Sequence, residues 1–470
     1  MRLMLILALL CAPFLYSQDD PVRKPAPKAG QSDFRDGEEA FTKGEMGKAV
    51  EHFTTAIEAQ PENDEIYAYR AAAYVALGER DAADADLAEA MKLDTTFSLA
   101  WNTRGYLHWL RGEFQSAIDD YTAAIAYAAD DRRVDAGGRA QLYQNRGVAW
   151  QDVGNTDRAL LDFDRCIELL PDQPAFYENR GLIYVDKKLF DVAFRDFDRA
   201  LELDSKNARG YVNRAWAARL MGDLEQSVRD YSQALRLQPD YAQARIGRGY
   251  TWLAWKRVEM AASDFQAAAT IKGFEAAAHA GLGDVALASG KLEVARQEFS
   301  TARMHDTYSE AAWYGLAKAE FLLKRYADAE TNARSLCRMA PRHADYWRLN
   351  ADILAAQSDW QRVVAALNRL LELAPGDLEA LKLRLRCYVR LAQFDTARGD
   401  AEQIGESDVT AGLIEDARIS TLEAATDWKR FALAYLKSAS SLGASLAALA
   451  DDADFAALKD DPEFKELTGK

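Results

Sequence analysis

The chain has 470 residues, of which 49% are apolar and 28% are charged, and its formal net charge is -16 at pH 7. This length allows several ordinary domains or one long array of repeats, and the apolar content is sufficient for a buried core. The strong negative charge repels the phosphate backbone of nucleic acids, so we expect no nucleic-acid partner.

The first twenty residues have the layout of an export signal. In MRLMLILALLCAPFLYSQDD one arginine precedes an apolar run, and small and polar residues follow it. We therefore expect residues 1–18 to be a signal peptide and the protein to be exported, periplasmic or secreted. The apolar run is shorter than the roughly 20 residues of a membrane span. An uncleaved N-terminal anchor and a lipid on Cys11 are the alternatives, and membrane contact is expected only through this segment.

Residues 19–31 are rich in proline, lysine and other charged residues, which is typical of a flexible linker. Beyond the signal, only Cys166, Cys337 and Cys387 remain, and this odd number at wide spacing is no disulfide framework. The five histidines of the chain are scattered, so we expect no metal site and no cofactor.

Internal repetition dominates residues 32–407. Small residues recur at a step of 34 residues, with one longer step of 42 residues from Gly105 to Gly147. A second small residue follows each of these by twelve positions, and a large residue, usually aromatic, follows by sixteen. The second small residue and the large residue are four positions apart, which places them on one face of a helix. A turn signal separates this helix from the one that carries the first small residue. Each repeat is therefore predicted to be a pair of antiparallel helices that buries its apolar face by stacking on its neighbours.

The repeats resemble tetratricopeptide repeats. The segment AWNTRGYLHWLRGEFQSAIDDYTAAI from Ala100 carries the aromatic, glycine, tyrosine and alanine positions of that family. The resemblance covers about eleven repeats and implies an all-α, right-handed superhelical solenoid of antiparallel helix pairs. It also implies a non-enzymatic protein whose first helices line a concave groove for a partner peptide or partner helix.

Two stretches depart from the regular pattern. The longer step places an insertion near residues 127–140, where we expect a lengthened helix end and a loop, with a ligand at Arg132 and Arg133 as the alternative. Residues 408–470 are predicted to form a degenerate helix pair and a C-terminal capping segment. Asp427 is predicted to cap the second of these helices, and Asp461 with Pro462 to begin the last one.

An arginine interrupts the apolar pattern of seven repeats, as in YENRGLIY around Arg180. Each such repeat has an aspartate sixteen residues later, on the second helix, whereas repeats without the arginine lack the aspartate. A planar guanidinium can hold a carboxylate by two hydrogen bonds, so we predict a ladder of structural ion pairs. A row of phosphate-binding arginines is the alternative, which the aspartates would neutralise. The predicted pairs are Arg70–Asp86, Arg104–Asp120, Arg146–Asp162, Arg180–Asp196, Arg214–Asp230, Arg248–Asp264 and Arg384–Asp400.

The position after the first small site, and the one a turn further, are apolar in the middle repeats. We predict that these residues line the partner-binding groove; the alternative is that they pack internally. In the later repeats the first of these positions is charged, at Asp284, Lys318, Asp352 and Arg386. The predicted groove residues are Tyr106, Trp109, Val148, Leu182, Val185, Trp216, Tyr250 and Leu253.

No pattern of catalytic residues is found. GLGDVA at Gly281 imitates a dinucleotide-binding motif but falls in phase with the first helix of a repeat. Asn145, Asn179 and Asn213 match one element of the family's carboxylate clamp, but its lysine is absent, so that activity is not carried over. We expect a scaffold or adaptor of the cell envelope or secreted space. The alternatives are a holdase-like chaperone for exported proteins and a component of a polymer-export or envelope-assembly complex.

Overall fold

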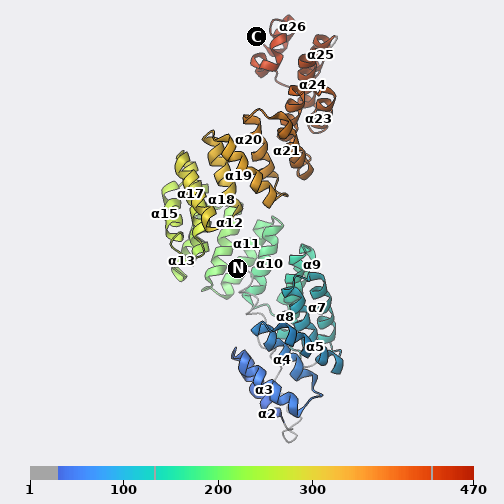
Figure 1. Cartoon of the computed structure of the whole chain (residues 1–470), viewed down its shortest axis with the longest axis vertical. Coiled ribbons are helices and arrows are strands. Elements are labelled where there is room, and N and C mark those ends of the chain that lie inside the picture. The colour runs from blue at the N-terminus through green and yellow to red at the C-terminus, as the bar shows by residue number, and fades with distance from the viewer. Residues whose placement is uncertain (1–29, 132–133, 425–426, 470) are drawn as a thin grey trace. The chain divides into compact units, whose positions relative to one another are not determined.

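The computed structural model describes residues 30–131, 134–424 and 427–469, and every regular element within these ranges is a helix (Figure 1). The expected signal peptide, Cys11, all but the last two residues of the expected linker, and Arg132 with Arg133 lie outside the described residues. Within the described ranges, no helix combines the length and the apolar character needed to cross a membrane.

Consecutive helices form eleven hairpins, as the repeat pattern predicts. They are α2 (Gln31–Thr42) with α3 (Met46–Ala59), α4 (Asp64–Leu77) with α5 (Arg80–Leu93), α6 (Ser98–Leu110) with α7 (Phe114–Ala128), α8 (Ala136–Asp152) with α9 (Thr156–Leu169), α10 (Pro174–Asp186) with α11 (Phe190–Leu203), α12 (Ala208–Met221) with α13 (Leu224–Leu237), α14 (Ala242–Ala254) with α15 (Val258–Ala268), α16 (Glu275–Ala288) with α17 (Leu292–His305), α18 (Glu310–Leu322) with α19 (Tyr326–Met339), α20 (Ala344–Ala356) with α21 (Trp360–Leu373), and α22 (Leu378–Arg390) with α23 (Phe394–Ser407).

The chain divides into two compact units, an N-terminal unit that ends at Gly247 and a C-terminal unit that begins at Arg248. The division falls inside α14. Within each unit the second helix of a hairpin packs on the first helix of the next, and first helices of successive hairpins also touch. The described residues thus form an all-α solenoid in which every hairpin buries its apolar face against its neighbours.

In six hairpins a glycine of the first helix lies against an aromatic ring of the second helix, as the sequence predicts. A Cβ built on Gly181 would lie 2.6 Å from Cε1 of Phe197, whose side chain is fully buried. In the C-terminal unit, the ring of Phe299 lies against Gly283 of its own hairpin and also against Gly315 of the next one. The ring therefore fills the space between two successive first helices, and glycine allows the close approach.

The turn inside each hairpin uses one residue with a left-handed backbone. Glycine occupies this position in six hairpins, whereas five hairpins place a residue with a side chain there at an energetic cost of roughly 1 kcal/mol. The glycines are Gly44, Gly78, Gly112, Gly154, Gly222 and Gly290, and the other residues are Lys188, Lys256, Lys324, Ser358 and Ala392.

The insertion is accommodated between α7 and α8. Helix α8 has 17 residues, and Asp135 caps it by accepting a hydrogen bond of 2.8 Å from the backbone N–H of Gly138. Val134 is buried in a small apolar cluster with Ala128 and Leu142. Val134 and Asp135 therefore anchor the end of the insertion to the hairpin that precedes it and to the helix that follows it.

Beyond the last repeat, the chain forms α24 (Val409–Glu423), α25 (Trp428–Ser441), two short 3-10 helices (Ala447–Asp451 and Ala453–Leu458) and α26 (Pro462–Thr468). Asp461 caps α26 as predicted, since its carboxylate accepts from the backbone N–H groups of Glu463 and Phe464. The prediction for Asp427 is wrong. Its backbone is left-handed, with φ 63°, rather than the extended conformation that N-capping requires, and its side chain makes no capping hydrogen bond.

We expect Gly181→Ala to lower the free energy of unfolding by roughly 1–3 kcal/mol, because the added methyl group would overlap the ring of Phe197. Gly399→Ala in α23 is the matched control, since a Cβ there meets nothing within 4 Å. The control should gain roughly 0.5–1 kcal/mol from higher helix propensity. Urea denaturation of the three proteins measures both changes, and effects of the same sign would contradict this account of the packing.

Candidate functional site

The structure brings together the two members of every predicted ion pair. In each pair the arginine Nε donates to Oδ2 of the aspartate at 2.7–3.0 Å, and Nη2 donates to Oδ1 at 2.6–2.7 Å. The pairs are therefore bidentate, the geometry in which arginine binds a carboxylate most strongly. Each pair links the first helix of a hairpin to its second helix. The seven pairs are Arg70–Asp86, Arg104–Asp120, Arg146–Asp162, Arg180–Asp196, Arg214–Asp230, Arg248–Asp264 and Arg384–Asp400.

The carboxylates of the ladder are buried. Their side chains are 4–9% exposed, whereas those of the arginines are 15–35% exposed. The hydrogen bonds that Arg180 donates to Asp196 raise the pKa of Arg180 above its ordinary value, and burial opposes this shift. Because the Nε and Nη2 donors of each arginine are already occupied by a carboxylate, the ladder is part of the framework of the fold.

Most of these arginines have a third partner that sequence reasoning missed. Nη1 donates to a polar side chain on the second helix of the preceding hairpin, so that one arginine ties three helices together. A signal was present, because the partner always stands two residues after the position of the preceding aspartate. The contacts are Arg70–Thr54 at 3.0 Å, Arg146–Thr122 at 3.2 Å, Arg180–Asp164 at 2.7 Å, Arg214–Asp198 at 2.5 Å and Arg384–Asn368 at 2.7 Å.

Aromatic rings flank the arginines along their own helix. The guanidinium carbon of Arg180 lies 5.7 Å from the ring centre of Tyr177 and 6.0 Å from that of Tyr184. Rings three residues before and four residues after a position lie on its side of the helix. In the segment YENRGLIY, the arginine therefore lies between two tyrosines while its guanidinium group donates hydrogen bonds to Asp196.

We expect Asp196→Ala to destabilise the protein by roughly 3–5 kcal/mol, because it strands a partly buried arginine. A double-mutant cycle with Arg180→Met, measured by urea denaturation, should give a coupling energy above about 1 kcal/mol. The same cycle at Arg104 and Asp120 is the internal comparison. Arg104 has Ala88 at the place of the third partner, and its side chain is the most exposed of the seven, at 35%. The coupling there should be smaller, and coupling near zero at Arg180 would refute the role of the pair.

The predicted groove residues lie at different depths. Tyr106 is 8% exposed and Val185 5% exposed, so both belong to the buried core. Trp109 is half-buried, stacks on Tyr106 with ring centres 5.9 Å apart, and donates its indole N–H to Asp152 at 2.7 Å. The other five, which are Val148, Leu182, Trp216, Tyr250 and Leu253, are half-buried.

From α16 onward, the position after the first small site carries a charged residue, at Asp284, Lys318, Asp352 and Arg386. Asp284 is half-buried, and burial raises its pKa from 3.8 to about 6, with Lys318 and Tyr250 acting in the opposite direction. Burial also raises the pKa of Asp352, and Arg348 opposes that shift. Ionisation of these first-helix carboxylates therefore lowers the free energy of unfolding.

We expect Asp284→Asn to stabilise the protein at pH 8 by roughly 1–2 kcal/mol. The folded pKa of Asp284 lies above its ordinary value, so its contribution to stability is complete below about pH 4 and is lost as pH rises through about 6. Asparagine resembles the neutral acid at every pH, and the difference between variant and wild type should therefore vanish near pH 4. Urea denaturation at pH 4, 6 and 8 tests this, and a difference independent of pH would contradict it.

Other candidate chemistry has a packing explanation. Gly281, in the GLGDVA segment, lies in α16 against the ring of Phe265. Cys166, Cys337 and Cys387 are buried free thiols, and burial raises the pKa of Cys387 to about 11. Among the described residues, no group of three or more His, Cys, Asp or Glu side chains is placed to hold a metal ion.

Stacked helical hairpins with a period of 34 residues define a helical-repeat solenoid, the class of protein described by this fold. Sequence profiles of the tetratricopeptide repeat match residues 208–241 and residues 146–208, 280–344 and 314–377. Residues 146–241 and 280–377 therefore match tetratricopeptide repeats, a family that mediates protein–protein interactions.

Similar proteins share only parts of the chain. A stretch of 131 residues, 28% of this chain and 22% of the relative, is 25% identical to the Hsp70-Hsp90 organizing protein of Triticum aestivum. A stretch of 82 residues, 17% of this chain and 16% of the relative, is 40% identical to Tetratricopeptide repeat protein 6 of Homo sapiens. The crystal structure of the yeast Tom70 covers 77% of this chain and 96% of its own, with 14% identity and a TM-score of 0.46. This chain spans about a fifth of the length of these two sequence relatives.

Proposed function

We propose that the protein is a non-enzymatic scaffold or adaptor of the cell envelope or secreted space, which binds a peptide or helix of a partner protein on its first helices. The observation that carries this proposal is a row of half-buried apolar side chains, Val148, Leu182 and Trp216, at one position of three successive first helices. Tetratricopeptide repeats bind protein or peptide partners, which supports the choice of ligand class.

The packing of this row suits a docking surface. Leu182 and Trp216 rest on a buried cluster that contains Phe197 and Val185, so their positions are fixed before any partner arrives. The exposed parts of these side chains gain roughly 25 cal/mol for each Å² of apolar surface that a partner covers. Because the row runs across α8, α10 and α12, an extended segment or a helix could contact all three.

The export setting is supported by the N-terminal segment alone, through its single arginine, apolar run and small residues. The buried, unpaired thiols are compatible with an oxidising compartment, because they are inaccessible to each other and to solvent.

A holdase-like chaperone for exported proteins is the second candidate. Large apolar side chains that are exposed on second helices favour it, because exposed apolar surface can bind the apolar segments of unfolded chains. Leu161 is 65% exposed on α9, and Met304 is 73% exposed on α17.

We expect Trp216→Ala to weaken partner capture at least about tenfold, since tryptophan residues often dominate binding energy at interfaces. The test is a pull-down from extracts of the native envelope, with quantitation of each captured protein. Leu161→Ala, on the second helix of its hairpin, is the control and should capture normally. The melting temperature of each variant separates loss of binding from loss of folding.

One partner captured in stoichiometric amount supports the scaffold. Many captured proteins, together with suppressed aggregation of an unrelated unfolded protein, would support the holdase instead. Equal capture by wild type and Trp216→Ala would remove the first-helix row from the binding surface.

A further inference from the structure

The ion-pair ladder is interrupted at the hairpin of α20 and α21. Asn350 stands at the place of the ladder arginine and Ala366 at the place of its aspartate. Arg334, on α19, stands at the place of the third partner, which elsewhere in the ladder is uncharged or acidic and never basic. The two side chains that normally fill this junction of three helices are thus replaced by shorter ones.

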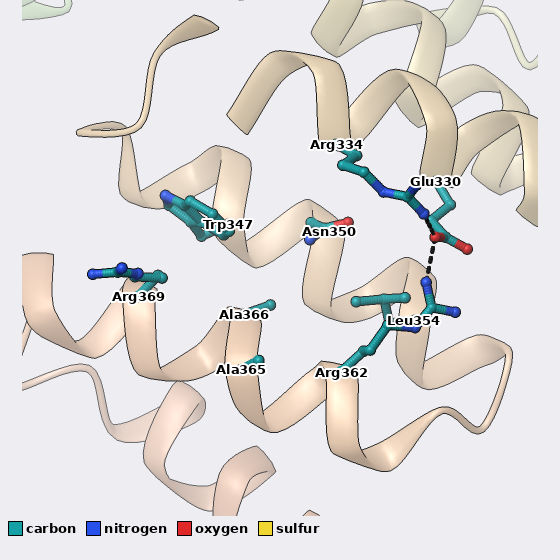
Figure 2. Close-up of a pocket in the computed structure, with 9 residues that line it drawn as sticks. All are labelled: Glu330, Arg334, Trp347, Asn350, Leu354, Arg362, Ala365, Ala366 and Arg369. Atoms are coloured by element: carbon teal, nitrogen blue, oxygen red, sulfur yellow. Dashed lines mark hydrogen bonds and ion pairs between the residues drawn. The ribbon is translucent and has the colours of Figure 1, made fainter. Parts of the chain in front are cut away.

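A cavity of about 310 Å³ occupies the junction (Figure 2). Its walls come from the three helices that a ladder arginine and its partners would join here, which we call the interrupted rung. Glu330 and Arg334 lie on α19, Trp347 and Asn350 on α20, and Arg369 on α21. This volume lies at the small end of the range of roughly 300–1,000 Å³ seen for ligand sites. The missing arginine and aspartate therefore leave a space large enough for a side chain from another molecule.

The side chains that line the cavity carry excess positive charge, although Asp359 and Glu372 next to the lining pair with two of its arginines. Arg334, Arg362 and Arg369 line it, whereas Glu330 is its one acidic lining residue among the described side chains. Glu330 is already held by Arg334, by Arg362 at 2.5 Å and by Gln357 at 3.0 Å. Such a concentration of arginine is distinctive in a chain whose net charge is -16.

The arginines remain available to an incoming carboxylate. Their side chains are 49–62% exposed, and Arg362 and Arg369 make additional pairs with Asp359 and Glu372 on the same helix. Exposed pairs of this kind contribute less than about 1 kcal/mol, so a ligand carboxylate can compete for these guanidinium groups. Figure 2 shows Arg369 beside Trp347 at one end of the cavity and Arg362 with Glu330 at the other.

Asn350 supplies an independent sign of a ligand. Its side chain is 8% exposed, and its Oδ1 atom has no hydrogen-bond donor among the described residues. A buried acceptor without a donor costs about 1–3 kcal/mol. The indole N–H of Trp347 is not that donor, because it binds the carbonyl of Pro341 at 2.9 Å. A ligand that brings an N–H group into the cavity would satisfy Asn350.

We propose that this cavity binds an acidic segment of a partner protein. The segment places a glutamate or aspartate carboxylate against the arginines and donates a main-chain N–H to Asn350. Trp347 and Leu354 provide apolar contact for the aliphatic part of the same side chain. The partner carboxylate thereby takes the place of the aspartate that the interrupted rung lacks.

The cavity is separate from the first-helix row. On α20, Asn350 precedes the row position at Asp352 by two residues, which is a rotation of about 200° around the helix. The cavity and the row position thus lie on opposite sides of α20. The proposal therefore does not depend on the function assigned to the row.

The test measures fluorescence anisotropy of fluorescein-labelled hexaglutamate with the full chain, and hexaglutamine is the uncharged control peptide. Hexaglutamate should bind at one saturable site, and hexaglutamine should not bind. We expect Arg362→Gln with Arg369→Gln to weaken binding at least about tenfold. Arg229→Gln, which removes an exposed and ion-paired arginine of α13, is the matched control and should leave binding unchanged.

A second variant tests the cavity while supporting the fold. Asn350→Arg, Ala366→Asp and Arg334→Asp together rebuild a complete rung, which should abolish hexaglutamate binding without lowering the melting temperature. Trp216→Ala should bind hexaglutamate normally, which separates this site from the row. The proposal is overturned if wild type does not bind hexaglutamate, or if the rebuilt variant still binds it. Binding of inorganic phosphate or ATP at this cavity, with none of hexaglutamate, would also overturn it in favour of an anion or nucleotide site.

Discussion

The bidentate contact between arginine and aspartate is the constraint on which the arrangement of the hairpins depends. A carboxylate with 4–9% exposure is stable in the solenoid only where a guanidinium meets both of its oxygens. The fork in turn fixes the distance and rotation between the two helices, because two parallel hydrogen bonds allow little sliding. Where Nη1 also reaches the preceding hairpin, the same side chain sets the register between neighbours. Apolar contacts such as that of Phe197 with Gly181 bury apolar surface, which many arrangements of the helices would allow. The bidentate hydrogen bonds restrict the hairpin to one of these arrangements.

Much of this architecture is readable from the sequence because the repeat displays each structural position many times. The step of 34 residues identified the hairpins, and the joint presence or absence of arginine and aspartate indicated their contact. A single repeat could not have distinguished Arg180 as a structural residue from Arg180 as a ligand-binding one. Repetition thus supplied information that otherwise requires related sequences.

The parts that sequence reasoning missed depend on contacts between repeats and on local backbone and packing details. The third partner of Arg180 involves Asp164 of another hairpin, and a pattern search confined to one repeat does not connect them. Asp427 has the residue type of a helix cap but not the backbone conformation, which its sequence neighbours do not determine. For the groove, the position of Tyr106 was clear but its depth was not, because an aromatic residue at helical spacing suits either a core or a surface. The cavity beside Asn350 arises from the absence of two large side chains, which only the packed structure reveals as empty space.

The interruption of the ladder also bears on how the array transmits stability along its length. In a solenoid, each repeat is stabilised by its own folding and by the interface with its neighbours, so weak interfaces divide the array into cooperative blocks. The hairpins of α16–α17, α18–α19 and α20–α21 lack the arginine that elsewhere joins three helices, and Arg384 restores it in the next hairpin. We expect amide hydrogens in these three hairpins to exchange through local opening at lower free energy than those between Arg180 and Asp230. A partner bound at the cavity would then link α19, α20 and α21 in the stretch where the arginine ladder provides no such link.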